Sequence, residues 1–374
     1  MLKHIMDAGL RAPKTLTLSI TNGCNLKCRH CWPESGFGSI SGPVDKEILF
    51  RLIDEFGRLS LEKIILAGGE SLTHPHWFEV LSQCCRQPRV QSVCLQTNAI
   101  LMSAVTVDKL LSLGDADFTI QVSLDGATAK THDRVRGKGS FARTLSGLRR
   151  LVAGGLGSRT FVAFTEMRHN FNELPLLLEL VADLGVSRLV AGTLIRGGRA
   201  AQNAHLLLPT PSQYKTLLDR YQTDPHFRTK YERSGNIAAL EWFRGKSSTG
   251  GTVCTCIETP YITADGRIHP CTLLQTEKYA VCGVHERSLK DVLTEALPLW
   301  SKLPEMSRRR SEALETCREC PGKSHCGGGC MGRAHATHGT IMVEEDRCAL
   351  RRAVYGYCSK VNSFCEQSRN RLSQ

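Results

Sequence analysis

Short β-rich runs alternate with helical stretches along roughly the first 200 residues, and this alternation constrains the fold more than any other feature of the chain. Asp45 can cap one of the helices, which carries Ile48, Leu52 and Phe56 on one face. Strands that alternate with helices form a parallel sheet. Six such units predict an α/β fold, an open, partial (β/α)6 TIM-like barrel, with its chemistry at the C-terminal ends of the strands. The predicted strands are Leu16–Ile20, Lys63–Ala67, Ser92–Gln96, Phe118–Leu124, Thr160–Phe164 and Arg188–Ala191.

Three cysteines follow the first predicted strand directly, at Cys24, Cys28 and Cys31. Three thiolates on one short loop can hold three irons of a cubane and leave the fourth iron open for a substrate or cofactor. Structural zinc usually takes four ligands from paired C-x2-C knuckles, which this loop lacks. The spacing therefore favours an iron–sulfur cluster, with zinc and three free thiols as the alternatives.

A second group of cysteines lies in the last third of the chain and is large enough for two fully ligated cubanes. Gly327–Gly329 allow a tight bend between two of its members. Zinc ribbons are the structural alternative, but the C-x2-C-x5-C-x3-C run within the group is tighter than two separated knuckles. The eight cysteines are Cys254, Cys256, Cys271, Cys317, Cys320, Cys326, Cys330 and Cys348.

These patterns predict three parts: a barrel in residues 1–200, a helical bridge and linker in 201–253, and a small cysteine-rich iron–sulfur domain with a C-terminal helical tail in 254–374. The bridge holds the helical pieces Ser212–Tyr221 and Ile237–Phe243 and ends in the glycine- and serine-rich stretch 245–251.

Composition narrows the function. The 17 cysteines come without a leader or an 18-residue apolar run, which favours metal or redox use and predicts neither secretion nor a membrane span. The net charge of +12 points to acidic partners, but thiolate-bound clusters carry negative charge that this count omits. The excess of basic residues is therefore weak evidence for nucleic-acid binding. The densest run of basic residues, Arg308–Arg310, is interpreted as a solvated helix or loop.

Taken together, these residues resemble the radical S-adenosylmethionine (SAM) enzymes with a C-terminal SPASM domain, over about residues 14–350. The resemblance rests on the first cysteine loop, on the C-x9-G-x4-C pattern of Cys256, Gly266 and Cys271, and on the later cysteine run. It implies SAM and three [4Fe–4S] clusters as cofactors. Cys24, Cys28 and Cys31 would hold the cluster that cleaves SAM to a 5′-deoxyadenosyl radical, which abstracts hydrogen from the substrate.

The resemblance also implies contacts to SAM after the strands. Gly68 and Gly69 would allow close backbone approach, and Glu70 would accept the methionine ammonium group. Arg136 would pair with the methionine carboxylate, and His30 would lie against the adenine. The remaining candidates are Ser123 and Asp125 for the ribose hydroxyls, and Thr97 and Asn98 on the cofactor side.

For the auxiliary clusters, the family pattern assigns Cys317, Cys320, Cys326 and Cys348 to the outer one. Cys271 and Cys330 would hold the inner one, with one or two ligands from Cys254 and Cys256, which stand only one residue apart here. The cysteines outside the pattern are interpreted as buried free thiols, and one in the helical tail as an alternative hydrogen donor. They are Cys84, Cys85, Cys94, Cys282, Cys358 and Cys365.

Three reaction classes within the family compete. Sulfatase maturation is disfavoured because Thr272, not aspartate, follows Cys271. Modification of a ribosomally made peptide is preferred, with haem or tetrapyrrole biosynthesis as the alternative, since a basic chain suits a polycarboxylate. The first strand begins near residue 15, which leaves no room for a leader-binding domain and predicts a separate leader-binding protein or a small substrate.

The expected electron donor is a flavodoxin or ferredoxin, and an oxygen-sensitive open cluster predicts a reducing cytoplasm. An iron–sulfur electron carrier or scaffold without enzymatic activity remains as a different class. A zinc-ribbon nucleic-acid binder is the weakest alternative. A carrier has no need for the cofactor-pocket segments Gly68–Glu70 and Ser123–Gly126, which therefore favour an enzyme.

Overall fold

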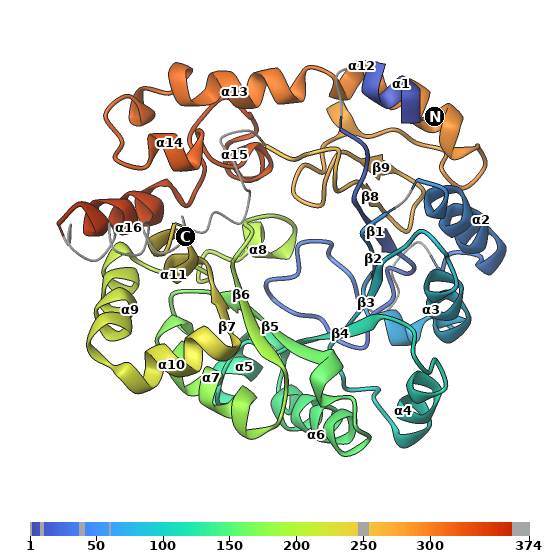
Figure 1. Ribbon diagram of the computed structural model, residues 1–374, viewed down its shortest axis with the longest axis horizontal. Helices are drawn as coiled ribbons and strands as arrows, with labels where there is room; N and C mark the ends of the chain where they lie inside the picture. The colour runs from blue at the N-terminus through green and yellow to red at the C-terminus, as the bar shows by residue number, and fades with distance from the viewer. Residues whose placement is uncertain (1, 8–10, 37–41, 60, 246–253, 361–374) are drawn as a thin grey trace, which may run out of the picture.

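The computed structural model describes residues 2–7, 11–36, 42–59, 61–245 and 254–360. Within them, nine strands form one sheet in the order β7-β6-β5-β4-β3-β2-β1-β8-β9. Neighbouring strands are parallel except for the β8–β9 pair, and the sheet curves into an open barrel (Figure 1). The predicted α/β partial barrel and its six strands are confirmed. The strands are β1 Thr15–Ser19, β2 Lys63–Ala67, β3 Ser92–Thr97, β4 Phe118–Ser123, β5 Thr160–Glu166, β6 Arg188–Thr193, β7 Gly235–Ile237, β8 Tyr261–Ile262 and β9 Ile268–His269.

Helices between the strands cover the outer face of this sheet (Figure 1). Asp45 caps α2 as expected, because its side chain accepts the amide of Glu47 at 2.8 Å. The same helix buries Leu52 and Phe56 against the sheet, which is the apolar stripe read from the sequence. The helices of this part are α1 Leu2–Asp7, α2 Lys46–Gly57, α3 Trp77–Cys85, α4 Ala104–Leu111, α5 Ala129–Arg136, α6 Ser140–Ala153, α7 Leu174–Asp183 and α8 Arg199–Gln202.

Strand β4 shows how the sheet separates its core from its site. Phe118, Ile120 and Val122 are buried, while the alternate residues are partly exposed. Since successive side chains on a strand point to opposite faces, Gln121 and Ser123 point into the barrel and the apolar residues face the helices. The inner face is therefore polar at the end where the site is expected.

Two parts of the sheet were not predicted from the sequence. Strand β7 lies in the segment interpreted as a helical bridge, and α11 begins only at Ala238. Strand β8 comes from the cysteine-rich region and pairs with β1, with Tyr261 beside Thr17. The glycine-rich linker lies outside the described residues after its first glycine. The helices of the bridge are α9 Pro211–Thr223, α10 Pro225–Ser234 and α11 Ala238–Phe243.

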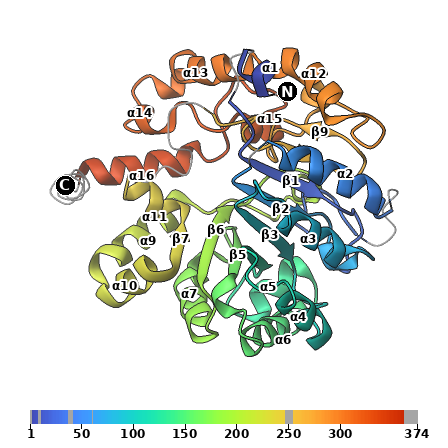
Figure 2. The same ribbon diagram turned by 45° about the vertical axis from the view of Figure 1, so that its right-hand side comes forward.

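The C-terminal region is more helical than its weak periodicity indicates. Its first helices lie beyond the β8–β9 end of the sheet, and α16 reaches α9 and α11 near β7 (Figure 2). Arg333 ties it to the barrel by donating to the carbonyl oxygens of Thr193 and Leu194 at the end of β6. None of the described helices has the length and apolar character to cross a membrane. The helices here are α12 Leu289–Trp300, α13 Leu303–Ala313, α14 Lys323–Cys326, α15 Met331–His338 and α16 Cys348–Lys360.

The basic run Arg308–Arg310 lies on α13, and its interpretation as a solvated segment is wrong for one residue. Arg308 and Arg309 are exposed, but Arg310 has no exposed surface. Its side chain turns toward the cysteine-rich loops, because α13 packs there with one face.

Candidate active site

The first cysteine loop leaves the end of β1 and lies inside the curve of the sheet (Figure 1). The loop after β2 packs against it: the amide of Gly69 donates to the carbonyl oxygen of Thr21 at 2.8 Å, and that of Glu70 to Gly23 at 2.9 Å. These backbone bonds hold the predicted glycine–glycine–glutamate segment directly beside the predicted cluster ligands.

The two glycines are required by this contact. A Cβ atom on Gly68 would lie 2.4 Å from the oxygen of Thr21, and Gly68 also has a φ of +148°. A Cβ on Gly69 would lie 2.2 Å from the oxygen of Gly23. Both approaches are far inside van der Waals contact, so a side chain at either position would push the two loops apart.

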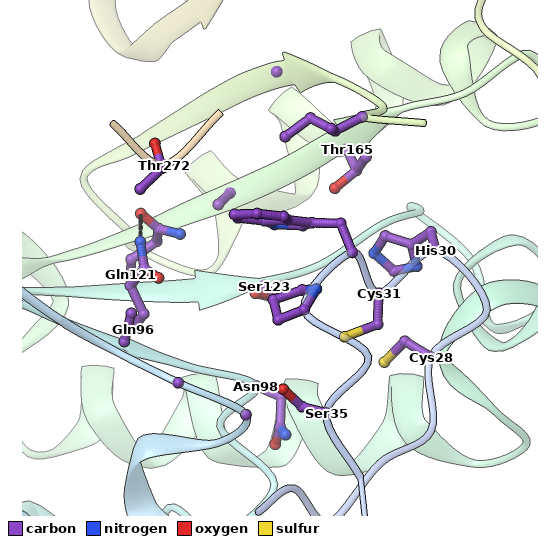
Figure 3. Close-up of a pocket in the computed structure, with 18 of the residues that line it drawn as sticks. Cys28, His30, Cys31, Ser35, Gln96, Asn98, Gln121, Ser123, Thr165 and Thr272 are labelled. Carbon is purple, nitrogen blue, oxygen red and sulfur yellow. Dashed lines mark hydrogen bonds between the residues drawn. The ribbon is translucent and has the colours of Figure 1, made fainter. Parts of the chain in front are cut away.

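A cavity of about 540 Å³ opens at this end of the barrel (Figure 3). It brings together the three cysteines of the first loop and every predicted SAM contact except Asp125. The predicted residues that line it are Cys24, Cys28, His30, Cys31, Gly68, Gly69, Glu70, Thr97, Asn98, Ser123 and Arg136.

Glu70 is the only carboxylate among the described lining residues, and it is almost fully buried. Burial raises its pKa, while hydrogen bonds lower it. The Thr97 hydroxyl donates to Oε1 at 2.6 Å, and the Asn98 amide donates to Oε2 at 2.6 Å. Oε1 also accepts the Leu72 amide at 3.2 Å, so the three donors fix the carboxylate, and Oε2 keeps a lone pair that can accept from an ammonium group.

Asp125 does not line the cavity. It is fully buried, its Oδ1 accepts the amide of Thr165 at 2.7 Å, and its Oδ2 accepts Arg136 Nε at 2.6 Å. His30 Nε2 lies 3.1 Å from the same Oδ2. The ribose contact predicted for Asp125 is therefore corrected, because this carboxylate orients Arg136 and His30 instead. Of the two predicted ribose contacts, Ser123 and Asp125, only Ser123 reaches the cavity.

The charges around Asp125 agree with this role. Burial opposes its ionisation, but Arg136 and His30 hold the pKa of the carboxyl well below its usual range. Burial lowers the pKa of His132 to about 4, and its Nδ1 accepts the amide of Asp125 at 3.0 Å. Asp125 is thus an anion paired with Arg136.

The cluster thiols are held in surroundings that disfavour free thiolates. The pKa of Cys24 is raised to about 12, chiefly by burial and to a smaller extent by the charges of Glu70, Cys28 and Cys31. Burial also raises the pKa of Cys28, against the opposing effect of Arg136. Cys28 is buried and Cys24 and Cys31 are partly buried. Neighbouring thiols of this kind need a positive centre to ionise together, and the irons of a cluster supply it. The donor set therefore fits a [4Fe–4S] cluster.

Arg199 is part of this site but was not predicted from the sequence. From the start of α8 it donates through Nε to the carbonyl oxygen of Cys28 at 2.9 Å and through a terminal nitrogen to that of Ser35 at 2.6 Å. It therefore holds the middle of the cysteine loop and the segment that follows the loop. It stands in a turn rich in arginine and glycine, where neither periodicity nor a motif predicts its contact with the cysteine loop.

The wall opposite the cluster loop is also new. Gln96 on β3 and Gln121 on β4 are register partners, and Gln96 Nε2 donates to Gln121 Oε1 at 3.3 Å. Thr272, the residue after Cys271, lies over this pair (Figure 3). The alternation of buried and exposed residues along β4 indicates that Gln121 points into the barrel. The residues that it contacts could be identified only from the fold. Other lining residues outside the predicted set are Thr17, Trp32, Ser35, Thr165, Thr193 and Tyr261.

The four cysteines assigned to the outer auxiliary cluster line one small cavity beside α14 and α16. Three cations (Lys323, Arg351 and Arg352) and two carboxylates (Glu344 and Glu345) line the same cavity. Nearby cations stabilise the negative charge of a set of thiolates, so this lining fits an anionic cluster. The four are Cys317, Cys320, Cys326 and Cys348.

The four candidates for the inner cluster also lie together. The Cys254 and Cys256 thiols are hydrogen-bonded to each other, and the charges of Cys271 and Cys330 act on Cys256. Burial raises the pKa of Cys271. In the described part of the chain, no three His, Cys, Asp or Glu side chains are arranged as the ligands of a single metal ion.

The cysteines outside the pattern are dispersed. Cys84 and Cys94 are buried and Cys85 is partly buried, as expected for free thiols, whereas Cys282 is exposed. The side chain of Cys358 and the whole of Cys365 lie outside the described residues.

Fold and site together define an iron–sulfur enzyme with a cofactor cavity at the mouth of a partial barrel. Residues 18–181 match the family model of the radical SAM superfamily. These residues form a radical SAM domain, which implies SAM and a [4Fe–4S] cluster as cofactors, and the cysteine-rich C-terminal region is consistent with the SPASM type.

Known relatives extend over almost the whole chain. AdoMet-dependent heme synthase of Methanosarcina barkeri is 27% identical over 369 residues, which cover 92% of this chain and 99% of the relative. Mycofactocin maturase MftC of Mycobacterium ulcerans is 28% identical over 334 residues, which cover 87% and 85%. The structure described as native anSMEcpe with bound AdoMet superposes with a TM-score of 0.74, covering 96% of this chain and 100% of that one; at 18% identity it shows the fold alone.

Proposed function

We propose that this radical SAM enzyme modifies a ribosomally made peptide, by a crosslink or a related change. The observation that carries the proposal is the neutral wall of the cavity opposite the cluster loop, made of amide and hydroxyl side chains. SAM and the cluster, when bound, supply a 5′-deoxyadenosyl radical that abstracts hydrogen from the substrate.

In this proposal the lining residues hold the cofactor. Cys24, Cys28 and Cys31 bind the cluster, and Glu70 accepts the ammonium group of SAM. Arg136 uses Nε for Asp125, so its terminal nitrogens serve the cofactor carboxylate. Ser123 serves the ribose. His30, held by Asp125, offers its ring face to the adenine, and Gly68, Gly69, Thr97 and Asn98 keep the loops around it in place.

We further propose that residues 254–374 hold two auxiliary [4Fe–4S] clusters. The cavity lined by Cys317, Cys320, Cys326 and Cys348 supports the outer one. The mutual contacts of Cys254, Cys256, Cys271 and Cys330 support an inner cluster with four protein ligands. A flavodoxin or ferredoxin is the expected electron donor, and a separate leader-binding protein the expected partner.

The charges in the cavity favour a peptide over a tetrapyrrole. Arg136 and Arg199 are the only cations among the described lining residues, and both are bound to protein oxygens. A substrate with several carboxylates needs unengaged cations, preferably arginine forks. Peptide groups need neutral donors and acceptors, and Gln96 and Gln121 keep an amide donor and an acceptor beyond their mutual bond.

Tetrapyrrole modification remains the second candidate, because the M. barkeri relative is a heme synthase and aligns over 99% of its length. Anaerobic turnover with SAM and a reductant separates the two, with mass spectrometry on a small peptide encoded beside this gene and on an iron-loaded tetrapyrrole. A peptide mass change with an unaltered tetrapyrrole supports our proposal, and the reverse pattern overturns it. If no 5′-deoxyadenosine forms, the carrier alternative is favoured.

Variants sharpen this test. Gln121→Ala is expected to lower peptide modification at least tenfold while SAM cleavage in the absence of peptide is retained, because the side chain faces the substrate end. Cys28→Ala is expected to abolish cleavage and spare the auxiliary clusters. Cys326→Ala is expected to lose auxiliary iron and substrate turnover, with less effect on SAM cleavage.

A further inference from the structure

The side chain of Arg310 is buried between the cysteine-rich loops. It has no exposed surface, and Nη2 donates to the carbonyl oxygens of Gly328 at 2.6 Å and Val343 at 2.9 Å. The neighbouring Arg309 differs entirely: its side chain is 73% exposed and pairs with Glu305. Of these two adjacent arginines, Arg310 is therefore buried and Arg309 lies on the surface.

Helix α13 contacts both groups of auxiliary cysteines. One turn before Arg310, the Ser307 hydroxyl accepts the amide of Cys254 at 2.8 Å. Gly328, between Cys326 and Cys330, lies so close that a Cβ on it would be 2.6 Å from the Cβ of Arg310. The helix thus fixes one cysteine loop with Ser307 and the other with Arg310.

Two nitrogens of Arg310 lack a partner within the described residues. Nε and Nη1 are both buried, and neither donates a hydrogen bond to a protein acceptor. Leaving a buried donor unpaired costs about 1–3 kcal/mol, and more for a charged group. Arginine cannot escape this cost by losing its proton under ordinary conditions. An acceptor that is not a protein oxygen is therefore required beside this guanidinium.

The electrostatic partners of Arg310 include cysteines of both auxiliary groups. The positive charge of Arg310 favours the thiolate of Cys254 in the inner group, and at Cys317 in the outer group it opposes burial, which raises the pKa of that thiol. In return, Glu345 and the thiols of Cys330, Cys317 and Cys326 act on Arg310. Its guanidinium therefore lies between the two predicted auxiliary clusters.

We propose that Arg310 is a positioning residue for the two auxiliary clusters, with Nη2 fixed on the protein and the Nε–H and Nη1–H groups directed to cluster sulfur. The inference rests on the auxiliary clusters of the proposed function. A cation with two donors stabilises the reduced, more negative state of a cluster more than the oxidised state. Arg310 therefore raises the reduction potentials of both clusters.

The test uses the full chain with Cys24, Cys28 and Cys31 all replaced by alanine, so that the remaining clusters are the auxiliary ones. Iron, sulfide and midpoint potentials are measured by anaerobic titration with electron paramagnetic resonance. Arg310→Met removes charge and donors, and Arg310→Lys keeps the charge but lacks the planar fork. Arg309→Met, one residue away on the surface, is the matched control.

We expect both midpoint potentials to shift to more negative values in Arg310→Met, to shift less in Arg310→Lys, and to stay unchanged in Arg309→Met. Potentials unaffected by either Arg310 variant overturn the inference. If Arg310→Met fails to fold, Arg310→Lys alone decides by the same criterion. A parent protein without about eight irons contradicts the auxiliary clusters of the proposed function instead, so the two failures are distinguishable.

Discussion

Arg136 donates its Nε–H to Asp125 Oδ2 at 2.6 Å, and this buried ion pair ties the end of α5 to the loop that follows β4. The same carboxylate accepts the amide of Thr165 and lies beside His30. One anion outside the cavity thus sets the orientation of two side chains inside it.

Asp125→Asn is expected to weaken SAM binding and to destabilise the protein by about 3–5 kcal/mol, because it leaves the buried Arg136 charge without its partner. Binding is measured by isothermal titration calorimetry of the reconstituted enzyme, and stability by anaerobic chemical denaturation. Asp115→Asn, on the surface, is the control and should change neither. Normal SAM affinity in Asp125→Asn contradicts the positioning role.

Gly69→Ala is expected to separate the two loops at the cavity, since its Cβ would lie 2.2 Å from the Gly23 oxygen. Overpacking of this kind costs about 1–3 kcal/mol. The measurable result is a weaker SAM cluster signal and slower formation of 5′-deoxyadenosine. Gly356→Ala, in α16 with nothing within 4 Å of the added methyl group, should leave both unchanged. An active Gly69→Ala enzyme with full iron disproves the steric argument.

Arg199→Met removes two charge-assisted hydrogen bonds that hold the cysteine loop, at Cys28 and Ser35. Each is worth about 1.5–3 kcal/mol. We expect the SAM cluster to be lost first, so that iron falls from about twelve to about eight per chain. Iron analysis and spectroscopy after anaerobic purification measure this loss. Arg196→Met, which lies outside the cavity lining, serves as the control, and equal iron in the two variants refutes the role of Arg199.

His132 predicts a dependence of stability on pH. Burial lowers its pKa to about 4 in the folded state, below the ordinary value of about 6.5. The unfolded chain therefore binds a proton first as the pH falls below 6.5, which destabilises the fold; the loss is complete only below pH 4. At pH 5.5 the expected loss is about 1.2 kcal/mol relative to pH 7. His132→Gln should reduce the slope between pH 7 and 5.5 in anaerobic denaturation, and an identical slope rejects this assignment.

The barrel strands were predictable because each is a β-rich run of five to seven residues between helical stretches. Strands β8 and β9 have two residues each, too few for any period, and they form only because β1 offers an edge. The glycine–glycine–glutamate segment and the Ser123–Gly126 segment also identified cavity residues at the ends of strands, including Glu70 and Ser123.

What the sequence could not provide were contacts between distant segments. Arg199 reaches the cysteine loop across 171 residues, and Arg333 reaches the carbonyl of Thr193 across 140. Neither arginine differs in local pattern from the exposed arginines of the chain. The burial of Arg310 within a basic run has the same cause, since only packing decides which face of α13 is covered.

The pairing of β8 with β1 has a consequence for synthesis of the chain. Until Tyr261 and Ile262 have left the ribosome, the free edge of β1 exposes unpaired backbone groups beside Thr17 and Leu18. Such an edge can recruit other nascent chains. A ribosome that stalls anywhere between the first cysteine loop and residue 262 should therefore release an aggregation-prone fragment, and coexpressed chaperones should improve the yield of the intact enzyme.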